Sequence, residues 1–360
     1  MWGGQSWLPP AFEPALVWLH PCSAVGQDFV LRRLPEPPFG SVSLTHHRSK
    51  LLAVLTPTNR RDFLGMLAGA AGFSLAPSAF AQTAVTATKL TDNFIHITGA
   101  GSNVLLVTAP DSSLMVDGGS KEHSTDLLKL VAEQSKAPVK VLFNTHWHWD
   151  HTGSNEPLGK AGAKIVAHEF TKQWLGTEID SQWEKRTYEP LPKVALPTET
   201  FYGSAKQTMK FGQETIEYAL MPQAHTDGDI YVYFPRPNIL MAGDVVSGFR
   251  YPVLDYTTGG WINGLLNAQK GLLTMINAET RIIPGTGPIQ TKADLQSQND
   301  TLTIIRDSLM KLLKSGNGPK EMIAAKPTKE FDEKWGNPDQ FIFNAYKGLW
   351  GHVRELGGIV

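Results

Sequence analysis

The sequence predicts a mixed α/β (α+β) protein in which two β-rich halves are flanked by helices. Short apolar or alternating runs bounded by turn-forming residues are typical of strands. The first series lies at 94–97, 104–107, 114–116 and 139–143, and a second lies at 163–167, 207–211, 215–220, 230–234 and 239–241. Apolar residues at helical spacing predict helices near 124–134 and 260–276.

The first half begins as a strand meander, because turn-rich segments at 101–103 and 110–113 separate its strands. The helix near 124–134 carries Leu127, Leu128, Leu130 and Val131 at helical spacing. The run Val139–Phe143 then predicts a buried strand, and a His-rich loop follows it directly.

Between the halves, residues 174–200 are rich in Trp, Glu and Pro and have weak periodicity. We interpret this segment as an insertion that could overhang a site. After the second half, Thr291 and Asp294 resemble a capping box that begins a helix, and Gly316 is placed to end it. Helices are therefore expected to close the chain over 291–360, and residues 82–360 are expected to form one domain.

Composition favours small-molecule chemistry. The chain has 360 residues, 41% of them hydrophobic, and a formal net charge of -1. This balance gives no indication of nucleic-acid binding or of attraction to an anionic membrane. The only cysteine, Cys22, precedes the predicted working domain, so that a bound metal would need His and carboxylate ligands.

Residues 54–81 are typical of an export signal. The pair Arg60–Arg61 is followed by a moderately apolar run to Leu75, and Ala79–Ala81 forms a small-x-small cleavage site before Gln82. The pattern resembles a bacterial twin-arginine signal and implies export of a folded, metal-loaded protein to the periplasm. A short buried or anchoring helix is the alternative, but the run is shorter than the roughly 20 apolar residues that span a bilayer.

Residues 1–53 are unusual in front of such a signal, because they are rich in Pro, Trp and His and lack clear periodicity. We expect either a translation start near Val54, from an alternative initiation codon, or a disordered extension. N-terminal sequencing of the expressed product distinguishes the two.

The loop His146-Trp147-His148-Trp149-Asp150-His151 carries the strongest functional signal. In an extended segment, residues two apart point the same way, which lets His146 and His148 bind one cation. Asp150 and His151 are expected to turn towards a second cation. A pH-sensing or merely exposed His cluster is the alternative, and unpaired clustered imidazoles make it costly.

This H-x-H-x-D-H loop, followed by Gly153, resembles the signature of the metallo-β-lactamase superfamily, which implies a four-layer αββα sandwich. Further segments agree in order. Ala224–Asp229 is similar to the loop that carries the third His ligand, here His225, and Met241–Asp244 is similar to the strand end that carries the bridging carboxylate, here Asp244. The segment Val116–Gly119 is similar to the element in which an aspartate, here Asp117, orients other groups. The likeness runs from about Phe94 to Pro288.

The resemblance implies a zinc site at His146, His148 and His225, and a second site at Asp150, His151 and Asp244. We expect Asp117, Thr145 and Asp229 to orient these ligands without binding the metal themselves. One departure concerns Thr286, which stands where the superfamily ordinarily has a His ligand. A neutral hydroxyl is a poor zinc ligand, so Thr286 is expected to line the site, with one zinc ion bound firmly and a second bound weakly.

Several other aromatic and imidazole side chains are less specific. His123 and His168 could complete the second site but fit structural roles better. Trp147 and Trp149 are expected to pack around the loop, and Trp183, Tyr188 and Tyr202 are possible substrate contacts.

The resemblance implies hydrolysis of a carbonyl ester, thioester, lactone or β-lactam by metal-activated water, with Asp150 as the catalytic proton acceptor. Other divalent metals could replace zinc. The alternative is a degenerate single-metal binding protein without hydrolytic activity, because of Thr286. The expected partner is a small-molecule substrate, with neither nucleic acid nor stable membrane insertion after signal removal.

Overall fold

The computed structural model describes residues 84–248 and 250–352, which all belong to one compact unit. The predicted extension at 1–53 and the predicted signal at 54–81 lie outside the described residues. Within the two described ranges, no helix is long and apolar enough to cross a membrane.

Seven strands form the first sheet, in the order β1-β2-β3-β4-β5-β6-β9. Neighbours from β1 to β4 are antiparallel, whereas β4, β5, β6 and β9 are parallel. The strands are β1 Thr86–Lys89, β2 Phe94–Thr98, β3 Val104–Thr108, β4 Ser113–Val116, β5 Val139–Phe143, β6 Lys164–His168 and β9 Glu199–Phe201.

The second sheet has five strands in the order β10-β11-β12-β13-β14, antiparallel except for the β13–β14 pair. Its strands are β10 Gln207–Phe211, β11 Glu214–Leu220, β12 Ile230–Phe234, β13 Ile239–Gly243 and β14 Arg281–Pro284. A separate antiparallel hairpin, β7 Ile179–Ser181 and β8 Arg186–Tyr188, lies in the segment predicted to be an insertion.

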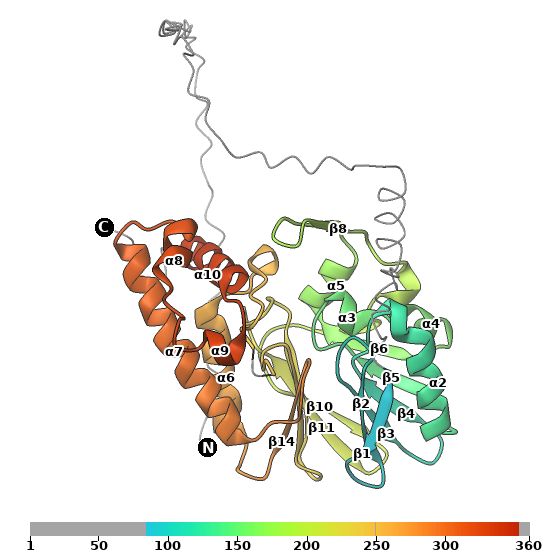
Figure 1. Cartoon of the computed structure of the whole chain (residues 1–360). Coiled ribbons are helices and arrows are strands. Elements are labelled where there is room, and N and C mark those ends of the chain that lie inside the picture. The colour runs from blue at the N-terminus through green and yellow to red at the C-terminus, as the bar shows by residue number, and fades with distance from the viewer. Residues whose placement is uncertain (1–83, 249, 353–360) are drawn as a thin grey trace, which may run out of the picture. The chain divides into compact units, whose positions relative to one another are not determined.

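The helices are α2 Ser124–Gln134, α3 Trp149–Thr152, α4 Asn155–Lys160, α5 Glu169–Leu175, α6 Ile262–Met275, α7 Lys292–Lys314, α8 Pro319–Ala325, α9 Asp332–Trp335 and α10 Asp339–Gly351. Three 3-10 turns, η1 Lys121–His123, η2 Lys193–Ala195 and η3 Tyr256–Thr258, connect other elements. Figure 1 shows α2 and α4 on one side of the sheets and α6 and α7 on the other.

Strand alternation produces the layers. Leu105 and Val107 of β3 pack between the two sheets, whereas Val104 and Leu106 point to the opposite face and pack with Leu127 of α2. In the central layer, Phe94 and Phe234 contact across the sheets with ring centroids 5.0 Å apart. The outer face of the second sheet packs on α6, α7 and α10. The predicted four-layer αββα architecture is therefore confirmed.

The layers place the functional loops at strand ends. The carboxyl ends of β4 and β5 lead into Asp117 and the His-rich loop, and β13 leads into Asp244. The carboxyl end of the neighbouring β14 lies beside Asp244, because the amide of Gly285 donates to the carbonyl of Gly243 at 2.8 Å. Segments that are distant in sequence thus meet at one edge of the two sheets.

Candidate metal centre

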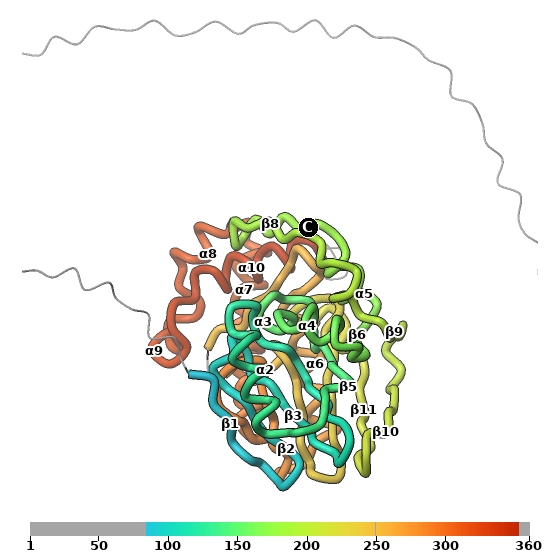
Figure 2. The backbone as a smooth tube through the Cα atoms, turned by 90° about the vertical axis from the view of Figure 1, so that its right-hand side faces the viewer, coloured from blue at the N-terminus to red at the C-terminus, as the bar shows by residue number. Residues whose placement is uncertain are grey.

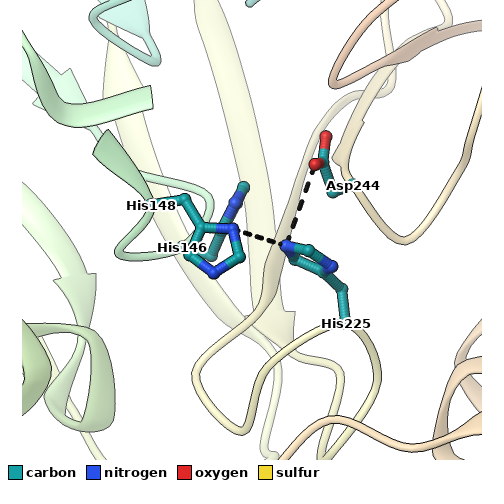
Figure 3. Close-up of side chains that lie close together, drawn as sticks. All are labelled: His146, His148, His225 and Asp244. Carbon is teal, nitrogen blue, oxygen red and sulfur yellow. Dashed lines mark hydrogen bonds and ion pairs between the residues drawn. The ribbon is translucent and has the colours of Figure 1, made fainter. Parts of the chain in front are cut away.

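Three imidazoles and one carboxylate converge at this edge. Side-chain atoms able to bind a metal on His146, His148, His225 and Asp244 all lie within 4.8 Å of one another (Figure 3). Nδ1 of His148 lies 2.9 Å from Nε2 of His225, and Nε2 of His225 lies 3.8 Å from Oδ2 of Asp244. The imidazoles are buried, and the Asp244 side chain keeps 14% of its surface exposed, so the cluster has a route to solvent.

Each of the three imidazoles uses its outer nitrogen in a hydrogen bond. Nδ1 of His146 lies 3.1 Å from Oγ1 of Thr145. Nδ1 of His225 donates to the carbonyl of Val253 at 2.7 Å, and Nε2 of His148 donates to Oδ2 of Asp255 at 3.2 Å. These partners fix each ring and aim its other nitrogen at the shared space.

The hydrogen bonds also identify which nitrogens carry lone pairs. A carbonyl oxygen only accepts hydrogen bonds, so Nδ1 of His225 carries the proton. In the neutral ring, Nε2 then carries a lone pair. By the same reasoning, neutral His148 presents a lone pair at Nδ1, 2.9 Å from that of His225. Such a pair is stable only with a proton or a cation between the nitrogens. Among the described residues, the buried Nε2 of His146 has no hydrogen-bond partner. The donor set fits a zinc ion.

Electrostatics keep two of the three rings neutral. Burial and then the charge of His148 lower the pKa of His225 to about 4. Burial, with neighbouring imidazoles, holds the pKa of His146 well below its usual value. For His148, burial lowers the pKa but hydrogen bonding to Asp255 and its charge outweigh this, and the net pKa is raised. A proton and a cation therefore compete for the space beside His148.

Asp117 holds both ends of the His-rich loop through hydrogen bonds to Thr145 and His151. Its Oδ1 accepts from the Thr145 amide at 2.8 Å, and its Oδ2 accepts from the Thr145 hydroxyl at 2.8 Å. The same Oδ2 lies 2.8 Å from Nδ1 of His151, which turns Nε2 of His151 towards Asp244. Asp117 adopts a positive φ of 64°, a conformation that aspartate tolerates better than most residues.

Two glycines allow the strand ends to approach the ligands. Gly243 has a φ of 53°, and a Cβ there would lie 2.8 Å from Oγ1 of Thr145. A Cβ on Gly285 would collide with Oδ1 of Asp244. Both positions therefore need glycine for Asp244 to reach the imidazoles.

The second group of predicted ligands also comes together. Nε2 of His151 lies 3.4 Å from Oδ1 of Asp244 and 3.9 Å from Oδ2 of Asp150. Thr286 follows Gly285 and lines a groove of about 410 Å³ with His96 and His123. His151, Asp150 and the shared Asp244 thus form an incomplete ligand set for a second ion. Thr286 stands where a further imidazole ligand would be expected.

Asp229, His168 and His123 form hydrogen bonds within their own loops and helix ends. Asp229 accepts from the amide and the hydroxyl of Thr226, which braces the loop that carries His225. His168 caps α5, with Nδ1 accepting from the Phe170 amide, and Nδ1 of His123 contacts the Ser120 hydroxyl. Tyr202 is 75% exposed.

The predicted aromatic contacts surround the His-rich loop. Trp147 is buried and packs on Tyr188 with ring centroids 5.1 Å apart, while Trp149 remains 38% exposed. Trp149 and Tyr188 line a groove of about 600 Å³ beside the loop. The lining of this groove includes none of the four clustered ligands.

Asp255 is a site residue that sequence reasoning missed. It is buried, orients His148, and accepts a further hydrogen bond from the Thr258 hydroxyl at 2.6 Å. Burial raises its pKa, but bonding to His148 brings the net pKa down to about 2. A signal did exist: a metal-bound imidazole usually donates to a carboxylate, and between Asp244 and Thr286 the chain offers only Asp255 and Glu279.

Comparison with known proteins identifies the family. A model described as the metallo-beta-lactamase superfamily matches residues 97–285. The chain belongs to this superfamily. Its members are mostly hydrolases and typically bind zinc, and the matched residues include all four clustered ligands.

Characterised superfamily relatives are distant. A metallo-beta-lactamase type 2 of Bacillus sp. (strain 170) is 24% identical over 202 residues, 56% of this chain and 72% of that protein. A hydroxyacylglutathione hydrolase of Thermosynechococcus vestitus is 28% identical over 44% of this chain and 51% of its own length. A linear primary-alkylsulfatase of Pseudomonas sp. is 21% identical over 68% of this chain and 55% of its own length.

Solved structures agree with the superfamily fold. A metallo-beta-lactamase from Pontibacter korlensis superposes with a TM-score of 0.50 at 24% identity, covering 61% of this chain and 99% of that chain. A sec-alkylsulfatase from Pseudomonas sp. superposes with a TM-score of 0.59 at 16% identity, covering 73% of this chain and 50% of that chain. At these identities, the likeness concerns the fold alone.

Proposed function

We propose that this protein is a zinc-dependent hydrolase that uses activated water on a carbonyl ester, thioester, lactone or β-lactam. The observation that carries the proposal is the arrangement of His146, His148 and His225, whose inner nitrogens share one space while their outer nitrogens are held by hydrogen bonds. When bound, zinc supplies Lewis-acid polarisation of a carbonyl oxygen and increases the acidity of water.

The chain supplies a proton acceptor next to this space. The Asp150 carboxylate lies 3.9 Å from Nε2 of His151, and 22% of its side chain is exposed. In the proposed reaction, Asp150 orients the attacking water and receives its proton, then returns the proton to the leaving group or solvent. Asp117 holds the His151 ring through Nδ1 at 2.8 Å, which leaves Nε2 of His151 facing the Asp150 carboxylate.

A substrate panel tests this function. Purified protein would be assayed against a β-lactam, a lactone, a thioester, a carboxylic ester and an alkyl sulfate, the last because of the likeness to alkylsulfatases. Elemental analysis of the same samples would give the bound metal. Wild type is expected to hold zinc and turn over at least one carbonyl substrate.

Ligand variants and a matched control show whether turnover depends on the metal site. His146→Ala and His148→Ala are expected to lose zinc and at least 100-fold in turnover, because each removes a ligand. His168→Asn, which alters a helix-capping imidazole but keeps an acceptor, is expected to retain both. Turnover that survives the loss of zinc would refute the mechanism, and turnover of the alkyl sulfate alone would reassign the substrate class.

A second candidate function rests on Thr286. In this alternative, the protein binds one zinc ion and has no hydrolytic activity, because a hydroxyl is a poor replacement for an imidazole ligand. This candidate gains support if the protein holds about one zinc per chain, turns over no substrate, and gains both a second ion and activity in Thr286→His. It loses support if wild type already turns over a substrate with one ion bound.

A further inference from the structure

Trp183 links the insertion to the metal centre. The indole Nε1 donates to Oδ1 of Asp255 at 3.2 Å, and Oδ2 of the same carboxylate accepts from Nε2 of His148. Trp183 lies between β7 and β8, and both views place β8 at one end of the described unit (Figures 1 and 2). A hairpin outside both main sheets thus contacts the group that orients a metal-binding imidazole.

The carboxylate of Asp255 is fully engaged by donors. Oδ1 accepts from Trp183 and from the Thr257 amide at 3.1 Å, and Oδ2 accepts from His148 and from the Thr258 hydroxyl at 2.6 Å. Thr257 and Thr258 belong to the same short turn as Asp255, so they cannot by themselves fix that turn against the rest of the site. Backbone hydrogen bonds join the turn to the His225 loop, since the Asp255 amide donates to the His225 carbonyl at 2.9 Å. Among the side chains that bond to the carboxylate itself, Trp183 and His148 are the two from other segments.

A second tryptophan supports the same carboxylate indirectly. Nε1 of Trp147 donates to the Thr258 hydroxyl at 3.0 Å, and that hydroxyl donates to Asp255. Trp147 comes from the His-rich loop itself. The turn at Asp255 is therefore bonded to the His-rich loop directly through His148 and indirectly through Trp147, and to the insertion through Trp183.

We propose that Trp183 is a positioning residue: through Asp255 it holds the His148 imidazole in the orientation that binds the cation. The proposal rests on the proposed metal-dependent function and adds that the β7–β8 hairpin is part of the metal centre. Since a ring free to rotate loses ligand orientation, removing the indole N–H should weaken zinc binding without altering any ligand.

The insertion offers a matched control. Trp174 also comes from this segment, is also half-buried, and also donates Nε1 to a loop aspartate, here Oδ1 of Asp227 at 2.7 Å. Among the described residues, the Asp227 carboxylate forms no hydrogen bond with any of the three imidazoles. Trp→Phe at either position removes one N–H and keeps an aromatic ring.

The experiment measures zinc affinity of the full chain by competition with a chromophoric chelator, alongside the melting temperature of the metal-free protein. Trp183→Phe should weaken zinc binding on the order of 3- to 10-fold, the effect of one lost hydrogen bond, while Trp174→Phe stays within about twofold of wild type. Both variants should lower the metal-free melting temperature by similar amounts, because they lose comparable contacts.

A double-mutant cycle tests whether Trp183 acts through Asp255. Asp255→Ala should weaken zinc binding about 10- to 100-fold, and adding Trp183→Phe to it should have no further effect. Equal zinc affinities for Trp183→Phe and Trp174→Phe, or additive effects in the cycle, would overturn the proposal. If wild type itself binds no zinc, the proposed function fails first, and that outcome is distinct.

Discussion

At the scale of single residues, Gly243 shows how backbone conformation sets the ligand geometry. It has a positive φ, and an added Cβ would meet the Thr145 side chain, which contacts both Asp117 and His146. Gly243→Ala is expected to destabilise the protein by about 2 to 4 kcal/mol, from conformational strain plus the clash, and to weaken zinc binding. Urea unfolding measures the first effect and chelator competition the second.

Gly162→Ala serves as the control for strain alone. Gly162 has a φ of 82°, and a Cβ there meets no heavy atom within 4 Å. This variant should cost only about 1 kcal/mol and leave zinc affinity unchanged. Equal losses of stability at the two glycines would show that the contact with Thr145 is unimportant.

Residue patterns in the sequence anticipate the ligands better than the groups that hold them. His146, His148 and the pair Asp150–His151 are close in sequence, and their spacing predicts a shared site directly. Asp255 escapes prediction because it follows a segment without periodicity and reaches His148 only through the fold. The sequence suggests Trp183 as a substrate contact, whereas in the structure its N–H donates to Asp255.

At the scale of elements, the N-terminus of α7 provides a test of local stability. The predicted capping box is confirmed: the Thr291 hydroxyl accepts from the Asp294 amide, and the Asp294 carboxylate accepts from the Thr291 amide. Thr291→Ala should cost about 1 kcal/mol in urea unfolding at pH 7. Thr303→Ala, inside the same helix, should be nearly neutral, because alanine is the better helix former.

The cost at Thr291 should depend on pH. Bonds from Thr291 lower the pKa of Asp294, so the box stabilises the fold above the unfolded pKa of about 3.9 and loses this contribution as the pH falls through the lower folded pKa. Because the pair is near the surface, screening keeps the charge-dependent part well below 1 kcal/mol. A cost for Thr291→Ala that grows on acidification would contradict the assignment.

Elements with strong periodicity were predicted from sequence, and marginal ones were not. The strands of the central layer and α2, α6 and α7 follow their apolar patterns. The edge strand β1 is mostly exposed and has no apolar face, so pairing with β2 determines it. The four-residue β14 ends in Pro284 and depends on its parallel pairing with β13. Hydrogen bonding to a neighbouring strand therefore determines these short strands, whose own sequences carry no clear strand pattern.

At the scale of the whole molecule, metal binding should be linked to folding stability. A ligand that binds only the folded state adds about 2.7 kcal/mol at 100 times its Kd. For a domain of this size, that corresponds to a rise of about 5 to 10 °C in melting temperature. Differential scanning fluorimetry with and without a chelator measures the shift. His148→Ala should abolish it, and a zinc-independent melting temperature in wild type would argue against a structural link.

We also propose that the protein is exported, with Arg60 and Arg61 as the recognised pair and Gln82 as the first residue of the mature chain. In a bacterial host, replacing both arginines with lysine should retain the uncleaved protein in the cytoplasm. Cell fractionation and N-terminal sequencing read the outcome. Unchanged export in the double variant would exclude the twin-arginine route.

Three imidazoles from two distant loops are proposed to bind one cation. Anomalous diffraction at the zinc edge, from crystals of the zinc-loaded protein, tests it most directly. We expect a peak about 2.0 to 2.1 Å from Nε2 of His146, Nδ1 of His148 and Nε2 of His225. A zinc peak bound only at Asp150 and His151, or one that His225 does not contact, would show that the three imidazoles do not share a cation.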